Sequence, residues 1–149
     1  MNDATICHAC GQAMIRGVRQ VRLTYEGESA TVDLSGWYCP CGESIHSGKD
    51  MLVSDRALNQ LKARVEGLLD PSRIRAIREK LGLSQRKASQ ILGGGPNAFH
   101  KYEQGDVLAS RAVSNLLRLL EADPSQLTLL RDTPRTTPAI TATSSAILR

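Results

Sequence analysis

The chain is poor in aromatic residues and contains no long apolar run. One Trp, one Phe and three Tyr occur in 149 residues, so a hydrophobic core must be built mainly from aliphatic side chains. No apolar segment approaches the roughly 20 residues that a membrane-spanning helix needs. The opening residues, MNDATIC, lack the basic and apolar regions of a secretory signal. These absences favour a cytoplasmic protein without a membrane segment.

Positive charge is scarce in the first half of the chain and concentrated in the second. Residues 1–70 carry 7 Lys and Arg against 9 Asp and Glu, whereas residues 71–131 carry 10 against 5. The overall net charge of +4 therefore arises in the carboxy-terminal half. DNA-binding domains concentrate charge in this way to neutralise phosphates, although an ordinary basic domain would look similar.

Cysteine is also scarce, but its four residues occur in two close pairs. Cys7 and Cys10 are separated by two residues, and Cys39 and Cys41 by one. In a reducing compartment such pairs are more typical of metal sites than of disulfides. Four thiolates suit a tetrahedral structural zinc and leave no open position for catalysis. The sequence therefore predicts one structural Zn²⁺ held by these four cysteines.

The second cysteine pair is one residue shorter than usual, which leaves alternatives open. His8 or His46 could replace one thiolate as a ligand. A close C-x-C pair could also oxidise and release the metal, which would make the site redox-sensitive. A rubredoxin-like electron carrier with iron at the thiolates is a third interpretation, from a different class of function.

Two alternating segments lie between the cysteine pairs. Residues 16–25 and 30–38 alternate apolar and polar side chains, which predicts a β-hairpin with its tip at residues 26–29. Residues 49–69 then show helical periodicity, and the Asp70-Pro71 step marks a boundary because the residue before proline resists helical geometry. Trp37 is expected to pack beside the cysteines. The inward stripe of the helix is expected to contain Met51, Leu58, Leu61, Val65 and Leu68.

Residues 83–105, LSQRKASQILGGGPNAFHKYEQG, have the pattern of a helix-turn-helix. Ser84 is a good N-cap for the first helix, and three consecutive glycines stop it. Pro96 is expected to begin the second helix, because its fixed φ suits the first helical position. Further helices are predicted over residues 72–81, 110–121 and 125–131. Their inward residues are expected to be Ile74, Ile77, Leu81, Val113, Leu116, Leu117 and Leu120, the last four forming either a packing face or a dimer seam.

The second helix of this pattern carries polar side chains that suit base reading. Asn97 and Lys101 are four residues apart on one face, and these residue types bond to adenine and guanine edges. His100 lies beside them, and Gln85 and Arg86 begin the first helix, where they would meet phosphates. A solvated polar face would explain any one of these residues alone. Their combination with the glycine turn and the basic charge predicts DNA contacts by Asn97, Lys101, His100, Gln85 and Arg86.

The motifs CHAC, GWYCPCGESI and LSQRKASQILGGGPNAFHKYEQG together resemble the MqsA, or YgiT-type zinc-finger, antitoxins over residues 5–131. The last motif is also similar to the wider Xre/Cro helix-turn-helix group. The resemblance implies a zinc domain that neutralises an mRNA-cleaving endoribonuclease toxin. It further implies a carboxy-terminal domain that dimerises and binds a palindromic operator in its own promoter. The family's base-contacting asparagine and basic residue fall on Asn97 and Lys101, where the family often has arginine at the second position.

These patterns predict an α+β chain with two domains. Residues 1–69 are expected to form a small zinc-bound β-hairpin domain with a helix that binds the toxin. Residues 70–131 are expected to form an all-α Xre/Cro-like helix-turn-helix domain for DNA binding and dimerisation, and residues 132–149 a disordered tail. The expected function is that of a non-enzymatic type II antitoxin that represses its own operon. The alternative is a stand-alone zinc-containing helix-turn-helix regulator whose zinc domain either senses redox state or only folds.

Overall fold

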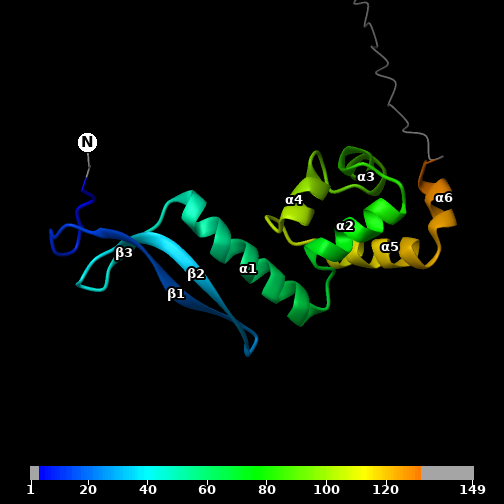
Figure 1. The fold of residues 1–149 in the computed structure, drawn as a ribbon. Helices are drawn as coiled ribbons and strands as arrows, with labels where there is room; N and C mark the ends of the chain where they lie inside the picture. Colours follow the sequence, from blue (N-terminus) through cyan, green and yellow to red (C-terminus); the bar gives the residue numbers. More distant parts are fainter. Residues whose placement is uncertain (1–3, 132–149) are drawn as a thin grey trace, which may run out of the picture.

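The structure is a computed structural model that describes residues 4–131, so the predicted tail at 132–149 lies outside the described residues. A β-sheet and a long helix form one end of the molecule, and a cluster of shorter helices forms the other (Figure 1). The predicted α+β class, with a cysteine-bearing hairpin followed by helices, is confirmed. The elements are β1 (Ile15–Tyr25), β2 (Glu28–Tyr38), β3 (Ser44–Ile45), α1 (Gly48–Glu66), α2 (Pro71–Lys80), α3 (Gln85–Leu92), α4 (Ala98–Gln104), α5 (Arg111–Ala122), the 3₁₀ turn η1 (Pro124–Gln126) and α6 (Leu127–Arg131).

The sheet is antiparallel with strand order β1-β2-β3. Tyr25 pairs with Glu28, so the hairpin turn contains only two residues. Both of these, Glu26 at φ 50° and Gly27 at φ 83°, adopt left-handed backbone geometry. That geometry matches the right-handed twist of the strands and allows the tightest hairpin connection. The predicted tip at residues 26–29 is therefore too long, because β2 already begins at Glu28.

Helix α1 begins with a capping box, in which the Ser47 hydroxyl accepts from the Asp50 N–H and the Asp50 carboxylate accepts from the Ser47 N–H. Arg16 of β1 donates two hydrogen bonds to the same carboxylate, at 2.9 and 2.5 Å. Arg16 also lies over the Trp37 ring, with its guanidinium carbon 5.9 Å from the ring centroid. The start of α1 is thus tied to β1 and, through Arg16 and Trp37, to the end of β2 that leads into the second cysteine pair.

The prediction for α1 was wrong about the residue at which the helix ends and about the direction in which Met51 faces. The helix ends at Glu66 rather than at residue 69, because Gly67 turns left-handed at φ 65° and Leu68 N–H bonds back to the Ala63 carbonyl. Met51 is 37% exposed instead of facing inward. Pairing Asp50 with Arg16 rotates the first turns so that a polar residue faces the sheet. The buried residues of α1 are Asp50, Ser54, Leu61 and Ala63.

The second half of the chain is held together by one aliphatic core. Ile74 and Ile77 of α2 pack with Leu117 and Leu120 of α5, and each is at most 2% exposed. Burying a large aliphatic side chain contributes about 1.5–3 kcal/mol, so this cluster accounts for much of the stability of the helical half. The inward residues of α5 therefore pack within the chain. Of the helices between residues 4 and 131, none combines the length and apolarity that crossing a membrane requires.

Candidate metal centre and nucleic-acid interface

The four cysteines converge at the end of the sheet. Their sulfur atoms all lie within 4.8 Å of one another. Cys7 Sγ is 3.6 Å from Cys41 Sγ, and Cys10 Sγ is 3.4 Å from Cys39 Sγ. A zinc ion with Zn–S bonds of about 2.3 Å requires sulfurs about 3.8 Å apart in a tetrahedron, so the spacing suits such a metal. The group therefore fits a four-thiolate metal site.

Each cysteine pair sits on its own tight backbone turn. Gly11 N–H donates to the Cys7 carbonyl at 2.9 Å, and Gly42 N–H donates to the Cys39 carbonyl at 3.0 Å. The second pair therefore forms a turn as the first one does. Although only one residue separates Cys39 from Cys41, the Cys41 sulfur still reaches the other three sulfurs. His46 lies elsewhere: its ring nitrogens contact the Ser35 carbonyl at 2.8 Å and the Ser44 hydroxyl at 3.1 Å. Among the described residues, the metal-binding group consists of cysteines alone.

The thiols differ in exposure and acidity. Cys7 and Cys39 are buried against Met14, Trp37 and Ile45, which confirms the expected place of the tryptophan, whereas Cys10 and Cys41 are exposed. The backbone N–H groups of Cys10 and Ala9 lower the pKa of the Cys7 thiol to about 7. The N–H of Cys41 lowers the pKa of Cys39, but burial and the neighbouring thiols outweigh it and raise the value to about 12. A divalent cation must therefore displace protons from this group to bind.

The helix-turn-helix lies at the other end of the molecule, in α3 and α4. The Ser84 hydroxyl caps α3 by accepting from the Lys87 N–H at 3.1 Å, as predicted. Helix α4 begins at Ala98 and not at Pro96, because Asn97 takes left-handed geometry at φ 61° and interrupts the helical path. Asn97 is exposed and makes no capping hydrogen bond with its side chain. Its amide therefore projects from the leading end of α4.

The glycine turn between α3 and α4 packs directly on α4. Gly93, Gly94 and Gly95 have φ values of 88°, 97° and 88°. A Cβ at Gly94 would lie 2.8 Å from Tyr102 Oη and 2.9 Å from Ala98 Cβ. A side chain at this position would both strain the backbone and push α4 away, so only glycine fits here.

Helix α4 separates its inward and outward residues cleanly. Ala98, Phe99 and Tyr102 are at most 8% exposed and belong to the core. Asn97, His100 and Lys101 are exposed on the opposite side, as is Gln104. Sequence interpretation missed Gln104, although its position, seven residues after Asn97 and three after Lys101, places it on the same helical face.

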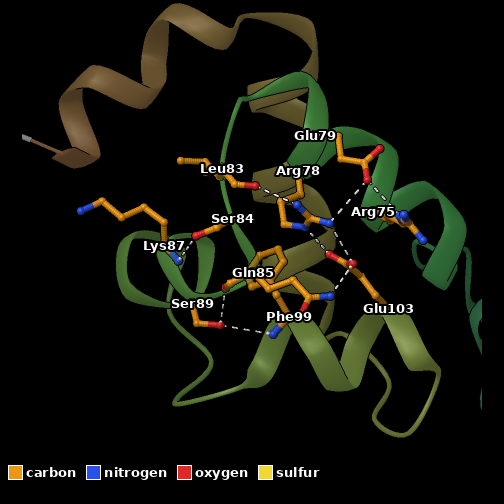
Figure 2. A network of polar contacts seen from close by, with 10 residues as sticks. All are labelled: Arg75, Arg78, Glu79, Leu83, Ser84, Gln85, Lys87, Ser89, Phe99 and Glu103. Atoms are coloured by element: carbon orange, nitrogen blue, oxygen red, sulfur yellow. Dashed lines mark hydrogen bonds and ion pairs between the residues drawn. The ribbon is translucent and has the colours of Figure 1, made fainter.

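A buried ion pair holds this helix in place (Figure 2). Arg78 of α2 donates to Glu103 of α4 at 2.5 and 3.1 Å, and the two side chains are 11% and 4% exposed. Arg78 also donates to the Leu83 carbonyl at 2.8 Å. Burial would raise the pKa of Glu103, but the hydrogen bonds from Arg78 and Gln85 reverse this and lower it below its ordinary value. Glu103 therefore stays ionised and orients α4 against α2.

Gln85, a predicted DNA contact, is part of this network. Its amide donates to Glu103 at 2.8 Å, so one of its two N–H donors is occupied within the protein. The Ser89 hydroxyl makes a second hydrogen bond between α3 and α4, because it accepts from the Phe99 N–H at 3.3 Å (Figure 2). Arg86 and Lys87 are exposed on the outer side of α3. Between the helices lies an open hollow of about 510 Å³, lined by Arg86, Ser89, Gln90, Gly93, Gly95, Pro96 and Asn97.

The similarity to known proteins extends over both the cysteine-bearing end and the helix-turn-helix end of the molecule. Residues 5–131 match the family described as the antitoxin component of bacterial toxin-antitoxin systems, MqsA. The chain is also 34% identical over 132 residues to antitoxin MqsA of Escherichia coli (strain K12), a match that covers 84% of this chain and 98% of the relative. The chain therefore belongs to the MqsA family of antitoxins.

Proposed function

We propose that this antitoxin represses its own operon by binding a palindromic operator through α3 and α4, and neutralises an mRNA-cleaving toxin through its zinc-binding half. The division of α4 into a buried face and an exposed polar face carries the DNA-binding part. Asn97 and Lys101 present amide and ammonium groups that suit adenine and guanine edges. Arg86 lines the same hollow as Asn97 and, with the exposed Lys87, would contact phosphates. Because the proposed operator and the mRNA cleaved by the toxin are both in the bacterial cytoplasm, we expect the protein to act there.

Substitution of Asn97 tests the operator part. We expect Asn97→Ala to weaken binding to the DNA upstream of its gene by about 1–3 kcal/mol and to relax preference at one base position. Gln20→Ala on β1 is a matched control, because it removes an exposed amide at the other end of the molecule from α4 (Figure 1). Fluorescence anisotropy with a labelled upstream duplex and an unrelated duplex measures both effects. Equal binding by Asn97→Ala and the wild type would contradict the assignment of α4 as the reading helix.

Lys101 is expected to set the strength of guanine recognition. Lysine keeps the positive charge of the family's frequent arginine but lacks the planar fork that bonds to two guanine acceptors at once. We therefore expect Lys101→Arg to sharpen discrimination between guanine and other bases at one operator position. Anisotropy measurements on operators substituted at single positions would show this difference.

Dimerisation would place two copies of α4 on the two halves of a palindrome. Leu117 and Leu120 are buried within the chain, but Leu119 on the opposite side of α5 is 68% exposed. Leu119 is thus a large apolar residue available to a second copy. We expect Leu119→Glu to shift the protein from dimer to monomer in light scattering and to weaken operator binding. A monomeric wild type would remove this part of the proposal.

The toxin surface is expected at the outer edge of β1. This strand has eleven residues, and no other described strand pairs with that edge. Ile15 and Val18 are 70% and 61% exposed along it. Unpaired edges with exposed apolar side chains invite pairing with another chain. Co-expression with the product of the neighbouring gene should yield a complex, and Val18→Asp should weaken its capture without changing DNA binding.

Zinc is the metal expected at the four thiolates. A structural zinc would fold the small sheet, which has little core of its own. Elemental analysis should give one zinc per chain, and a coloured protein would instead indicate iron. The stand-alone, redox-sensitive regulator predicts no toxin partner and a change in operator affinity on thiol oxidation. Failure to capture or neutralise the neighbouring gene product would favour that alternative.

A further inference from the structure

The second cysteine pair sits on a very short hairpin. Strand β3 contains only Ser44 and Ile45, so it pairs with β2 at two positions. The Cys39 N–H donates to the Glu43 carbonyl at 2.9 Å within the turn that leads from β2 to β3. A hairpin with so little pairing is marginal by itself. The turn that presents Cys39 and Cys41 therefore needs support from outside its own backbone.

The side chain of His46, which directly follows β3, provides such support. Its Nδ1 lies 2.8 Å from the Ser35 carbonyl oxygen of β2, and because a carbonyl only accepts, Nδ1 carries the hydrogen. Its Nε2 lies 3.1 Å from the Ser44 hydroxyl, and its ring meets the Tyr38 ring edge to face with the centroids 5.6 Å apart. The imidazole thus bonds to β2 just beyond the point where the backbone pairing of β3 stops.

Gly36 leaves the space that this ring occupies. A Cβ at Gly36 would lie 2.6 Å from His46 Cε1, closer still to Nδ1, and 3.0 Å from the Ile45 carbonyl oxygen. Gly36 is buried, and its φ is outside the left-handed region, so its backbone alone does not require glycine. The position of the imidazole explains why a side chain does not fit there. We call Gly36 and His46 the histidine latch.

We propose that His46 is a positioning residue for the metal site, although it is not a ligand itself. The latch holds β3 against β2 and so keeps Cys39 and Cys41 in place. Residues that orient metal ligands from outside raise metal affinity, because less order has to be created when the metal binds. This inference rests on the proposed zinc binding for its effect on affinity, but the latch can also be tested without zinc.

Two substitutions of His46 separate its hydrogen bond from its ring. His46→Ala removes both, whereas His46→Asn keeps an N–H donor close to the place of Nδ1. Gln20→Ala is the control, because it removes an exposed polar side chain from β1 of the same sheet. The full chain is used for every variant. Far-ultraviolet circular dichroism confirms that the helical half is folded in each.

Zinc affinity is measured by competition with a colorimetric chelator. We expect His46→Ala to bind zinc about 10-fold more weakly than the wild type, the lower end of the effect of losing an orienting partner. His46→Asn should recover most of this loss, and Gln20→Ala should bind as the wild type does. Equal affinity of His46→Ala and the wild type would overturn the proposal.

Cobalt(II) absorption distinguishes a positioning residue from a ligand. At saturating cobalt, we expect the thiolate-to-metal absorption of His46→Ala to equal that of the wild type, because all four thiolates remain. A lasting change in this absorption would show that His46 coordinates the metal and would overturn its positioning role.

A double variant tests the latch itself. Gly36→Ala places a methyl group against the ring, so it should weaken zinc binding at least as much as His46→Ala. In the double variant the methyl group no longer meets a ring, so its cost should be clearly smaller than the sum of the two single costs. Additive costs would overturn the latch.

The same cycle distinguishes this inference from the proposed zinc site. If the purified wild type held no zinc, the proposed occupancy would fail. Urea unfolding of the four proteins, followed by Trp37 emission, would still measure the coupling between Gly36 and His46. Non-additive unfolding free energies would support the latch, and additive ones would overturn it.

Discussion

Breaking the ion pair between Arg78 and Glu103 should destabilise the helical half strongly. Glu103→Ala removes a carboxylate that is 4% exposed and accepts hydrogen bonds from Arg78 and Gln85. The Arg78 guanidinium, 11% exposed, would keep the Leu83 carbonyl and, at 3.7 Å, the exposed Glu79 carboxylate as its partners. Leaving one charge of a buried pair without its partner costs about 3–5 kcal/mol. For a domain of this size, a loss of about 3 kcal/mol lowers the unfolding midpoint by about 12–25 °C.

A double variant separates the loss of the pair from the isolation of a charge. In Arg78→Met with Glu103→Leu, no charge remains buried, so we expect a cost of only about 1–2 kcal/mol. Urea unfolding followed by circular dichroism reports the helices, and emission of the single Trp, Trp37, reports the metal-binding half as an internal control. The single variants Arg78→Met and Glu103→Leu are measured beside the double variant. The buried pair would not have the role assigned to it if Glu103→Ala cost less than about 1 kcal/mol, or if the cost of the double variant equalled the sum of the costs of Arg78→Met and Glu103→Leu.

Three further predictions concern the metal, the glycine turn and acid. Cys10→Ser, or removal of metal by a chelator, should unfold the sheet and shift Trp37 emission to the red while the helical circular dichroism largely remains. Gly94→Ala should cost at least about 1–2 kcal/mol more than Gly95→Ala in urea unfolding, because only at Gly94 would the new Cβ meet another side chain as well as a strained backbone. Arg16 and Ser47 hold the pKa of Asp50 well below its usual range. The stabilisation by the Asp50 carboxylate should therefore be complete above the unfolded pKa of about 3.9 and be lost as the pH falls from there toward the lower folded pKa. The difference in unfolding midpoint between the wild type and Asp50→Asn should accordingly stay constant at neutral pH and shrink below about pH 4.

Much of the secondary structure could be predicted because its signals are local. Ser84 as a cap, the glycine turn and the spacing of Ile74 and Ile77 each depend on neighbouring residues in the chain, and all three are found in the structure. The grouping of the four cysteines was also predictable, since a hairpin necessarily brings its two ends together. Whether zinc occupies them, and whether Asn97 touches a base, remain predictions.

The errors arose where contacts between distant residues decided the outcome. Met51 fits an apolar stripe, but a salt bridge between Asp50 and Arg16, 34 residues away in the chain, sets the rotation of the helix. Pro96 suits a helix start, but the chain passes close to Tyr102 at Gly94 and takes left-handed geometry at Asn97, so α4 starts at Ala98. Nothing in the sequence alone indicates that the His46 ring lies beside Gly36, because no periodic pattern encodes a contact between these two segments.

The arrangement of α4 also bears on how such a regulator can change its target. The residues that hold this seven-residue helix, Phe99, Tyr102 and Glu103, point inward, whereas Asn97 and Lys101 contribute nothing to its packing. A mutation of Lys101 would therefore change a proposed base contact at little cost in stability, whereas Asn97 also holds a left-handed backbone that most other side chains adopt less readily. If α4 reads the operator as proposed, duplicated copies of this gene could diverge to new operators through changes at Lys101 while the protein remained folded, and the same property would make the helix a convenient scaffold for redirecting repression to a chosen DNA sequence.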